Sequence, residues 1–177
     1  MEKENNFNIF KIIIIIACII SFVGLLLPYE NSIGEYKKYL QDHPTEMYVR
    51  EVNLTNKDAE NISIIENFKI YSYAMNHSDG STWLAGESTI NFVLIIVLIA
   101  STVLILLFTL LNKRVLSIIF NILLFLSSIL MNFDIVSRGV IPSSKYTYGI
   151  SYYLYPIISI VILIATIVLI IKNKQKK

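Results

Sequence analysis

The sequence is poor in cysteine, histidine and charge. Charged residues make up 16% of its 177 residues, whereas a typical soluble domain carries about 25%. The lone cysteine, Cys18, lies inside an apolar stretch and can form neither an intramolecular disulfide nor a zinc site. Basic residues do not form a stripe interleaved with aromatics, so nucleic-acid binding has no support. The shortage of charge and the positive mean hydropathy indicate a membrane protein.

Sequence motifs for catalysis are also missing. The two histidines, His43 and His77, fall in a turn and in a polar loop, and they have no His-x-x-x-His or Gly-x-Ser-x-Gly motif around them. The apolar stretches contain no paired aspartates. We therefore expect a protein that is not an enzyme, with no catalytic residue, bound metal or cofactor.

Four long apolar stretches are what the sequence has in place of these motifs. About 20 apolar residues are needed for a helix to cross the hydrocarbon core. Lys11, near the start of the first stretch, can extend its ammonium group to the membrane surface. Lipid requires every backbone group to find a partner within the chain, so each stretch is expected to be a helix. The sequence predicts an all-α membrane protein of one domain, residues 1–177, with a four-helix bundle spanning the membrane at about 9–29, 90–111, 115–133 and 151–171.

The distribution of lysine and arginine predicts the orientation, because cytoplasmic loops are enriched in these residues. Only Glu2 and Glu4 oppose eight basic residues on one side of the predicted membrane. The other side carries seven basic and eleven acidic residues. We expect a multi-pass protein of the plasma membrane with both termini in the cytoplasm. The eight basic residues are Lys3, Lys11, Lys113, Arg114, Lys172, Lys174, Lys176 and Lys177.

The two segments on the other side, 30–88 and 134–150, are predicted to form a small extracytoplasmic α+β cap, built mainly by the first. Its apolar spacing predicts a short helix over 33–40, ended by Pro44, and a longer amphipathic helix over 64–75. Alternation over 47–54 and over 146–148 predicts two strands. Between them, Thr55 with Asp58 three positions later is typical of a helix start. We expect the longer helix to pack against the second segment.

Two sets of residues are candidates for contacts. Small residues Ala17, Ser21 and Gly24 follow one face of the first apolar stretch, which suits close helix packing within the bundle or between subunits. Asn121, in the third stretch, is expected to hydrogen-bond between helices. The surface expected to meet a protein partner is polar or aromatic and includes Glu60, Glu66, Lys69 and Trp83.

The sequence resembles small four-span membrane proteins of Gram-positive bacteria. The resemblance consists of Gly24-Leu25-Leu26-Leu27-Pro28 at the end of the first stretch, a basic turn at Lys113-Arg114, and Gly149-Ile150-Ser151-Tyr152-Tyr153 at the start of the fourth. It implies the four-helix fold and brings no activity, cofactor or functional residue with it. The layout is also claudin-like, but the claudin tryptophan motif and its two loop cysteines are missing.

Two functions of different classes fit these observations. The first is a non-enzymatic envelope protein, such as an accessory subunit or an immunity protein, that meets a protein partner at its extracytoplasmic face. The alternative is a subunit of a small channel or transporter. Such proteins place ionisable residues inside the membrane along their pathway, and here the polar third stretch would have to provide that pathway.

Overall fold

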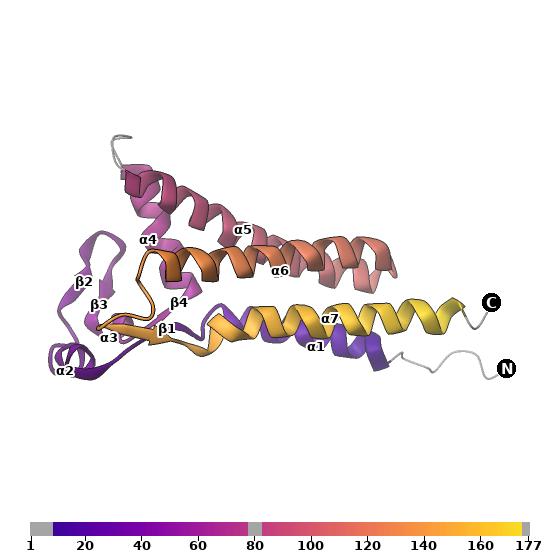
Figure 1. Cartoon of the computed structure of the whole chain (residues 1–177), viewed down its shortest axis with the longest axis horizontal. Coiled ribbons are helices and arrows are strands. Elements are labelled where there is room, and N and C mark those ends of the chain that lie inside the picture. Colours follow the sequence, from indigo (N-terminus) through magenta and orange to yellow (C-terminus); the bar gives the residue numbers. More distant parts are fainter. Residues whose placement is uncertain (1–8, 78–82, 175–177) are drawn as a thin grey trace.

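The computed structural model describes residues 9–77 and 83–174 (Figure 1). The described chain is mostly helical, with a small sheet region. Its elements in order are α1 (Ile9–Gly24), β1 (Pro28–Ser32), α2 (Gly34–Asp42), β2 (Met47–Val49), the 3₁₀ helix η1 (Arg50–Val52), β3 (Leu54–Thr55), α3 (Asn56–Ala59), β4 (Asn61–Ser63), α4 (Ile64–His77), α5 (Trp83–Leu110), α6 (Arg114–Ser137), β5 (Tyr146–Tyr148) and α7 (Ile150–Lys174).

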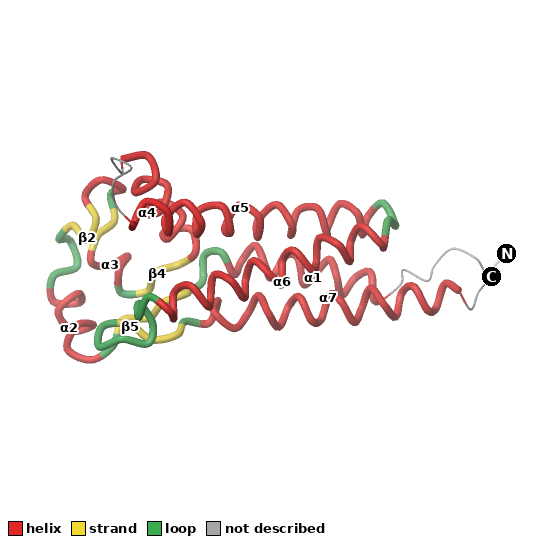
Figure 2. The backbone as a smooth tube through the Cα atoms, turned by 45° about the horizontal axis from the view of Figure 1, so that its top comes forward, coloured by secondary structure: helices red, strands yellow, loops and turns green. Residues whose placement is uncertain are grey.

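Three helices are long and apolar enough to cross a membrane: Ser88–Leu110 within α5, the whole of α6, and Ile150–Lys172 within α7. Helices α5 and α6 pack against each other, α6 packs against α7, and α1 packs against α7 and α5. Figure 1 shows these helices running along the long axis of the molecule, with all the strands gathered at one end. We call this the sheet end. The opposite end holds the start of α1, the α5–α6 turn and the end of α7 (Figure 2) and is called the turn end.

The outward surfaces of the long helices are apolar, while their inward surfaces form the core. Ile14, Leu98, Leu124 and Ile162 come from α1, α5, α6 and α7, and each is at most 1% exposed. Large apolar side chains such as that of Ile122 remain exposed on the outside. Soluble proteins rarely expose contiguous apolar surface of this extent. Together with the three long helices, this surface indicates a membrane protein.

The first apolar helix is shorter than the predicted span over 9–29. It ends at Gly24, after 16 residues, and the chain then tightens into two turns in which Leu25 and Leu26 donate to carbonyls three residues back. A helix end leaves carbonyl groups without partners. Here the hydroxyl of Ser151, at the start of α7, donates to the carbonyls of Gly24 (2.6 Å) and Leu27 (3.1 Å). Partners from a distant segment thus allow the helix to stop early.

The residues after this turn form the central strand of a three-stranded sheet in the order β4-β1-β5. Strand β1 is antiparallel to both neighbours, and Glu30 faces Ile62 of β4 on one side and Tyr148 of β5 on the other. Gly149 follows β5 and donates its backbone N–H to the carbonyl of Tyr29 (2.9 Å). A Cβ atom at Gly149 would collide with the backbone of Pro28 and Tyr29, so this close approach needs glycine.

The other elements of the sheet end match the sequence predictions in part. Helix α2 begins one residue later than the helix predicted over 33–40, with Ile33 as its N-cap, and α4 covers the helix predicted over 64–75. Strand β5 is the strand predicted over 146–148, and Thr55 and Asp58 form a capping box. The single strand predicted over 47–54 is wrong. It is a hairpin of β2 and β3, in which Asn53 adopts a left-handed conformation (φ 56°) that asparagine tolerates better than most residues.

Candidate functional site

Buried polar groups cluster where the long helices meet the sheet end. Glu30 of β1 is 3% exposed, and its carboxylate accepts a 2.9 Å hydrogen bond from the side-chain amide of Asn67 on α4. Burial raises the pKa of Glu30, while the bond from Asn67 and the charge of Arg138 oppose the rise. A buried ionisable residue is a candidate for a functional role because its burial costs stability.

An ion pair lies next to this carboxylate at the C-terminal end of α6. The guanidinium of Arg138 contacts the carboxylate of Asp134 at 2.6 Å and donates to the hydroxyl of Tyr71 on α4 (3.0 Å). Asn91 of α5 donates to the same carboxylate at 2.7 Å. These bonds join α4, α5 and α6 where a membrane-crossing helix would leave the hydrocarbon region. We find no proton acceptor and nucleophile paired as in an acid–base or acyl-transfer site among these groups.

Residues predicted to pack helices lie at the contact between α1 and α7. Ala17, Ser21 and Gly24 are buried on α1. A Cβ atom at Gly24 would meet the side chain of Leu154 at 2.6 Å, and the hydroxyl of Tyr155 donates to the Ser21 carbonyl at 2.8 Å. Small side chains on α1 therefore make room for large ones on α7.

Asn121 of α6 makes a hydrogen bond to α7. Its side-chain amide donates to the backbone carbonyl of Ser159 at 2.9 Å, and both residues are buried. The side-chain oxygen of Asn121 and the hydroxyl of Ser159 have no hydrogen-bond partner within the described structure.

Two residues of the predicted partner surface, Glu60 and Glu66, make contacts within the chain. Glu60 pairs with Lys37 (3.4 Å) and accepts a bond from Gln41 (2.7 Å), so it links α2 to the end of α3. Glu66 accepts from the backbone N–H of Ser63 at 2.5 Å, and the Ser63 hydroxyl accepts from the N–H of Glu66. This reciprocal pair is the geometry of a capping box at the start of α4.

The other two residues of that surface are Lys69 and Trp83. Lys69 is exposed on α4. Trp83 is the first residue of α5, and its side chain lies outside the described part of the structure. Helix α4 packs against α5 rather than mainly against the second connecting segment, with Phe68 stacked on Phe92 at 4.9 Å.

A different exposed surface was missed by sequence reasoning. Tyr39 of α2 and Met47 of β2 are each 48% exposed. The hydroxyl of Tyr39 donates to Glu46 (3.2 Å), and its ring lies against that of His43 at 4.7 Å. We call Tyr39, His43, Glu46 and Met47 the α2–β2 surface. Exposure of these side chains depends on how α2 meets the hairpin, which no local sequence pattern reveals.

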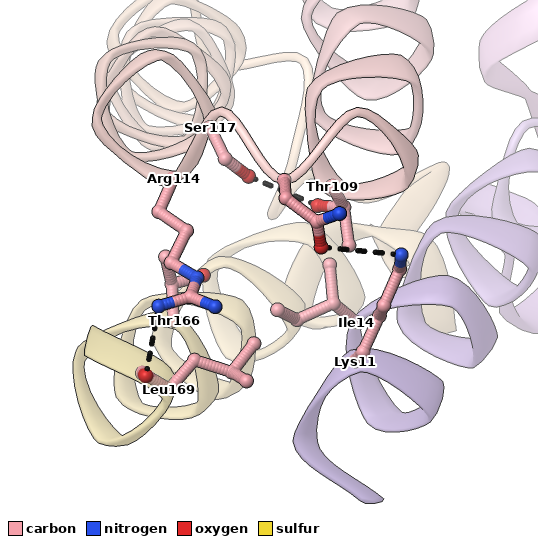
Figure 3. Close-up of a pocket in the computed structure, with 8 residues that line it drawn as sticks. Lys11, Ile14, Thr109, Arg114, Ser117, Thr166 and Leu169 are labelled. Atoms are coloured by element: carbon pink, nitrogen blue, oxygen red, sulfur yellow. Dashed lines mark hydrogen bonds between the residues drawn. The ribbon is translucent and has the colours of Figure 1, made fainter. Parts of the chain in front are cut away.

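A cavity of about 40 Å³ lies at the turn end between α1, the α5–α6 turn and α7 (Figure 3). That volume has room for roughly three water molecules. Lys11 and Arg114 lie on opposite sides of it in Figure 3, with the bonded hydroxyls of Thr109 and Ser117 (3.1 Å) near the turn. The lining residues are Lys11, Ile14, Thr109, Asn112, Arg114, Ser117, Thr166 and Leu169.

Metal-ligand geometry is not found in the described residues, where no three His, Cys, Asp or Glu side chains come together. Comparisons of the chain with protein-family models, with curated proteins and with solved structures found no match.

Proposed function

We propose that this chain is an integral protein of the plasma membrane that crosses it four times and binds a protein partner through its sheet end, outside the cell. It acts by binding and not by catalysis, in the manner of an accessory subunit or an immunity protein. Both termini lie in the cytoplasm. Helix α1 is the fourth span, together with the three helices long and apolar enough to cross a membrane.

Charge at the turn end supports the orientation. Lys11, Lys113, Arg114 and Lys172 all belong to this end, which also holds the start of α1 and the end of α7 (Figures 1 and 2). Cytoplasmic ends of spans are enriched in lysine and arginine. The orientation follows from this asymmetry.

The length of α1 fits a span when the residues after it are included. Sixteen helical residues extend about 24 Å, which is less than the roughly 30 Å hydrocarbon core, but Leu25–Leu27 continue the apolar surface. Ile16, Ile19 and Val23 are exposed on α1, as are apolar residues on the other long helices. Lipid would cover these side chains.

The observation that carries the proposal is the exposure of Tyr39 and Met47 at the sheet end. Elsewhere in the described chain, the large apolar side chains that remain exposed belong to the long helices or to the turns directly after them. Tyrosine and methionine are enriched at protein interfaces. Because the ring of Tyr39 is held by Glu46 and His43, it would lose little conformational entropy when a partner covers it.

A crosslinking experiment in native membranes tests this proposal. A photo-crosslinking amino acid at position 39 or 47 of the full-length protein should capture one and the same protein. Met47→Glu should weaken binding of the purified pair about tenfold, whereas Lys69→Glu, on α4, should leave it unchanged. Capture from position 69 alone would assign the interaction to the surface predicted from the sequence, and capture from neither would contradict the proposal.

One observation favours the second candidate, a channel or transporter subunit. The unpartnered oxygens of Asn121 and Ser159 lie inside the contact between α6 and α7, where buried polar atoms usually find a partner. A water or permeating solute would supply one. Flux through reconstituted membranes that Asn121→Leu changes, in a protein that captures no partner from position 39 or 47, would support this second function over the first.

A further inference from the structure

We infer that a groove between α6 and α7, close to the sheet end, binds one acyl chain of a membrane phospholipid. Residues near the end of α6 and at the start of α7 line this groove, which has a volume of about 490 Å³. Both of these helix ends lie beside the strands (Figure 1). The inference goes beyond the partner-binding proposal, because it concerns the side of the long helices and not the exposed residues of α2 and β2.

The walls of the groove are mainly apolar. Helix α6 contributes Ile129, Phe133 and Val136, which share one face of the helix because they recur at a spacing of three and four residues. Pro156 and Ile157 of α7 form the opposite wall. Among the described residues that line the groove, none is charged. The groove therefore suits an apolar ligand.

The amide and carbonyl groups beside the groove already have partners. Pro156 lies inside α7 and has no backbone N–H, so the carbonyl of Tyr152, four residues earlier, cannot receive the usual helical hydrogen bond. The side-chain amide of Asn132 donates to that carbonyl instead (2.9 Å). The side-chain oxygen of Asn132 accepts from the hydroxyl of Tyr29 (2.7 Å). A ligand in the groove thus need not supply hydrogen bonds to these groups, and an acyl chain has none to offer.

The surface around the groove identifies the apolar ligand as a lipid chain. Helices α6 and α7 are two of the three that are long and apolar enough to cross a membrane. The groove is continuous with their outward apolar surface, since Ile129, Ile157 and Phe133 are 40%, 57% and 71% exposed. Tyr152 and Tyr153 line it at the start of α7, and tyrosine is enriched where a span meets the headgroup layer. The headgroup therefore lies beside these rings, and the chain extends toward Ile129.

The size of the groove fits one acyl chain better than a helix of another protein. An apolar cavity of about 150 Å³ holds one benzene molecule, so on the same scale a groove of about 490 Å³ has room for roughly twenty carbon atoms. A helix about 10 Å across would fill the same volume with roughly one turn. The groove is thus large enough for one lipid chain and too small for a partner helix.

Native mass spectrometry of the purified full-length protein in neutral detergent tests the inference. The protein would be titrated with palmitoyl lysophosphatidylcholine, which has a single acyl chain, and in parallel with palmitoyl lysophosphatidylglycerol. We expect Ile129→Trp to weaken the binding of both lipids about tenfold, because the larger ring displaces roughly two CH₂ groups of the chain. Ile122→Trp is the matched control, since Ile122 lies on the same helix and is 48% exposed but does not line the groove.

A second variant and four other outcomes complete the test. Ile157→Trp, on the α7 side of the groove, should weaken binding as Ile129→Trp does, and it serves as the test if Ile129→Trp fails to fold. Equal loss in Ile122→Trp would show general contact between lipid and helices and overturn the site, as would unchanged binding in both groove variants. Loss of lysophosphatidylglycerol alone would show recognition of a charged headgroup and overturn the chain as ligand. A dimer that Ile129→Trp dissociates would assign the groove to a second copy and overturn the lipid as its occupant.

Discussion

The hydroxyl of Tyr29 donates a 2.7 Å hydrogen bond to the side-chain oxygen of Asn132, which lies 103 positions further along the chain. The amide of Asn132 in turn donates to the backbone carbonyl of Tyr152 at 2.9 Å. One asparagine on α6 thus joins the strand after α1 to the first turn of α7. The sheet end is thereby attached to the long helices by specific bonds, and its position relative to them is set.

Tyr29→Phe should destabilise the protein by about 1–3 kcal/mol, because it leaves the oxygen of Asn132 partly buried without its donor. Thermal unfolding in detergent would measure the loss. Tyr153→Phe is the control, since the ring of Tyr153 is about half exposed. Equal stability of the Tyr29→Phe variant and the wild type would mean that the bond contributes nothing.

Gly24→Leu should weaken the contact between α1 and α7. Even a Cβ atom at this position would approach the Leu154 side chain to 2.6 Å and the Tyr155 hydroxyl to 3.2 Å, and overpacking of this kind costs about 1–3 kcal/mol. Val23→Leu, at a neighbouring position that is 50% exposed, should have little effect on the unfolding temperature. An unfolding temperature that stays unchanged in both variants would show that the small residue at position 24 is not needed.

Stability should fall with rising pH because of Glu30. Burial raises the pKa of this carboxyl above its ordinary value of 4.5, so the folded state binds the proton more tightly than the unfolded state does. The resulting destabilisation is absent below pH 4.5 and develops as the pH rises through the raised pKa. It amounts to about 1.4 kcal/mol for each pH unit by which the pKa lies above 4.5.

Glu30→Gln can still accept the bond from Asn67 and has no charge to bury. We expect this variant to be more stable than the wild type at pH 8 and equally stable at pH 4, as measured by thermal unfolding across the range. Greater stability of the wild type at pH 8 would show that Arg138 and Asn67 more than offset the cost of burying the charge.

Phe68→Ala should destabilise the sheet end by about 2–3 kcal/mol, since it removes a ring that packs on Phe92 and against the core. Lys69→Ala, at the exposed neighbouring position, should be neutral. Glu66 also contributes to stability, because its carboxylate accepts a hydrogen bond from the backbone N–H of Ser63 at the start of α4. Glu66→Ala should cost about 1 kcal/mol, which circular dichroism during thermal unfolding would detect.

The proposed orientation can be tested by labelling introduced cysteines in intact cells with an impermeant thiol reagent. Cysteines at Asn61 and Ser144, both exposed at the sheet end, should react, and one at Asn173 should not. Ser63 is 4% exposed and would be a poor probe. Cys18 is buried and serves as the unlabelled background. Labelling at Asn173 with protection of the other two sites would reverse the orientation.

The sequence predicts the elements that depend on local patterns and misses those that depend on long-range contacts. Runs of apolar residues predict α5, α6 and α7 because length and hydropathy are local properties. Helix α4 and strand β5 were predicted from the local spacing of their apolar and aromatic residues. Strands β1 and β4 were not predicted, because pairing with distant segments, and not a local sequence pattern, defines them.

The candidate sites follow the same rule. The small face of α1 was found because its residues recur at helical spacing. The bond between Glu30 and Asn67, separated by 37 positions, and the convergence of Lys11 with Arg114 depend on how helices and strands meet. The exposure of Tyr39 and Met47 depends on it too, as does the pairing of Glu60 with Lys37 and Gln41. The capping box of Glu66 is different, because the Ser63-x-x-Glu66 spacing is a local sequence pattern.

The position of β1 between β4 and β5 has a consequence for biogenesis. Strand β1 is made early, but one of its two edges stays open until residues 146–148 leave the ribosome, and the end of α1 receives its partner Ser151 later still. Helix α1 must therefore stay incompletely packed while the rest of the chain is synthesised. A chain that stops before β5 would keep that open edge permanently, and quality-control proteases should remove it.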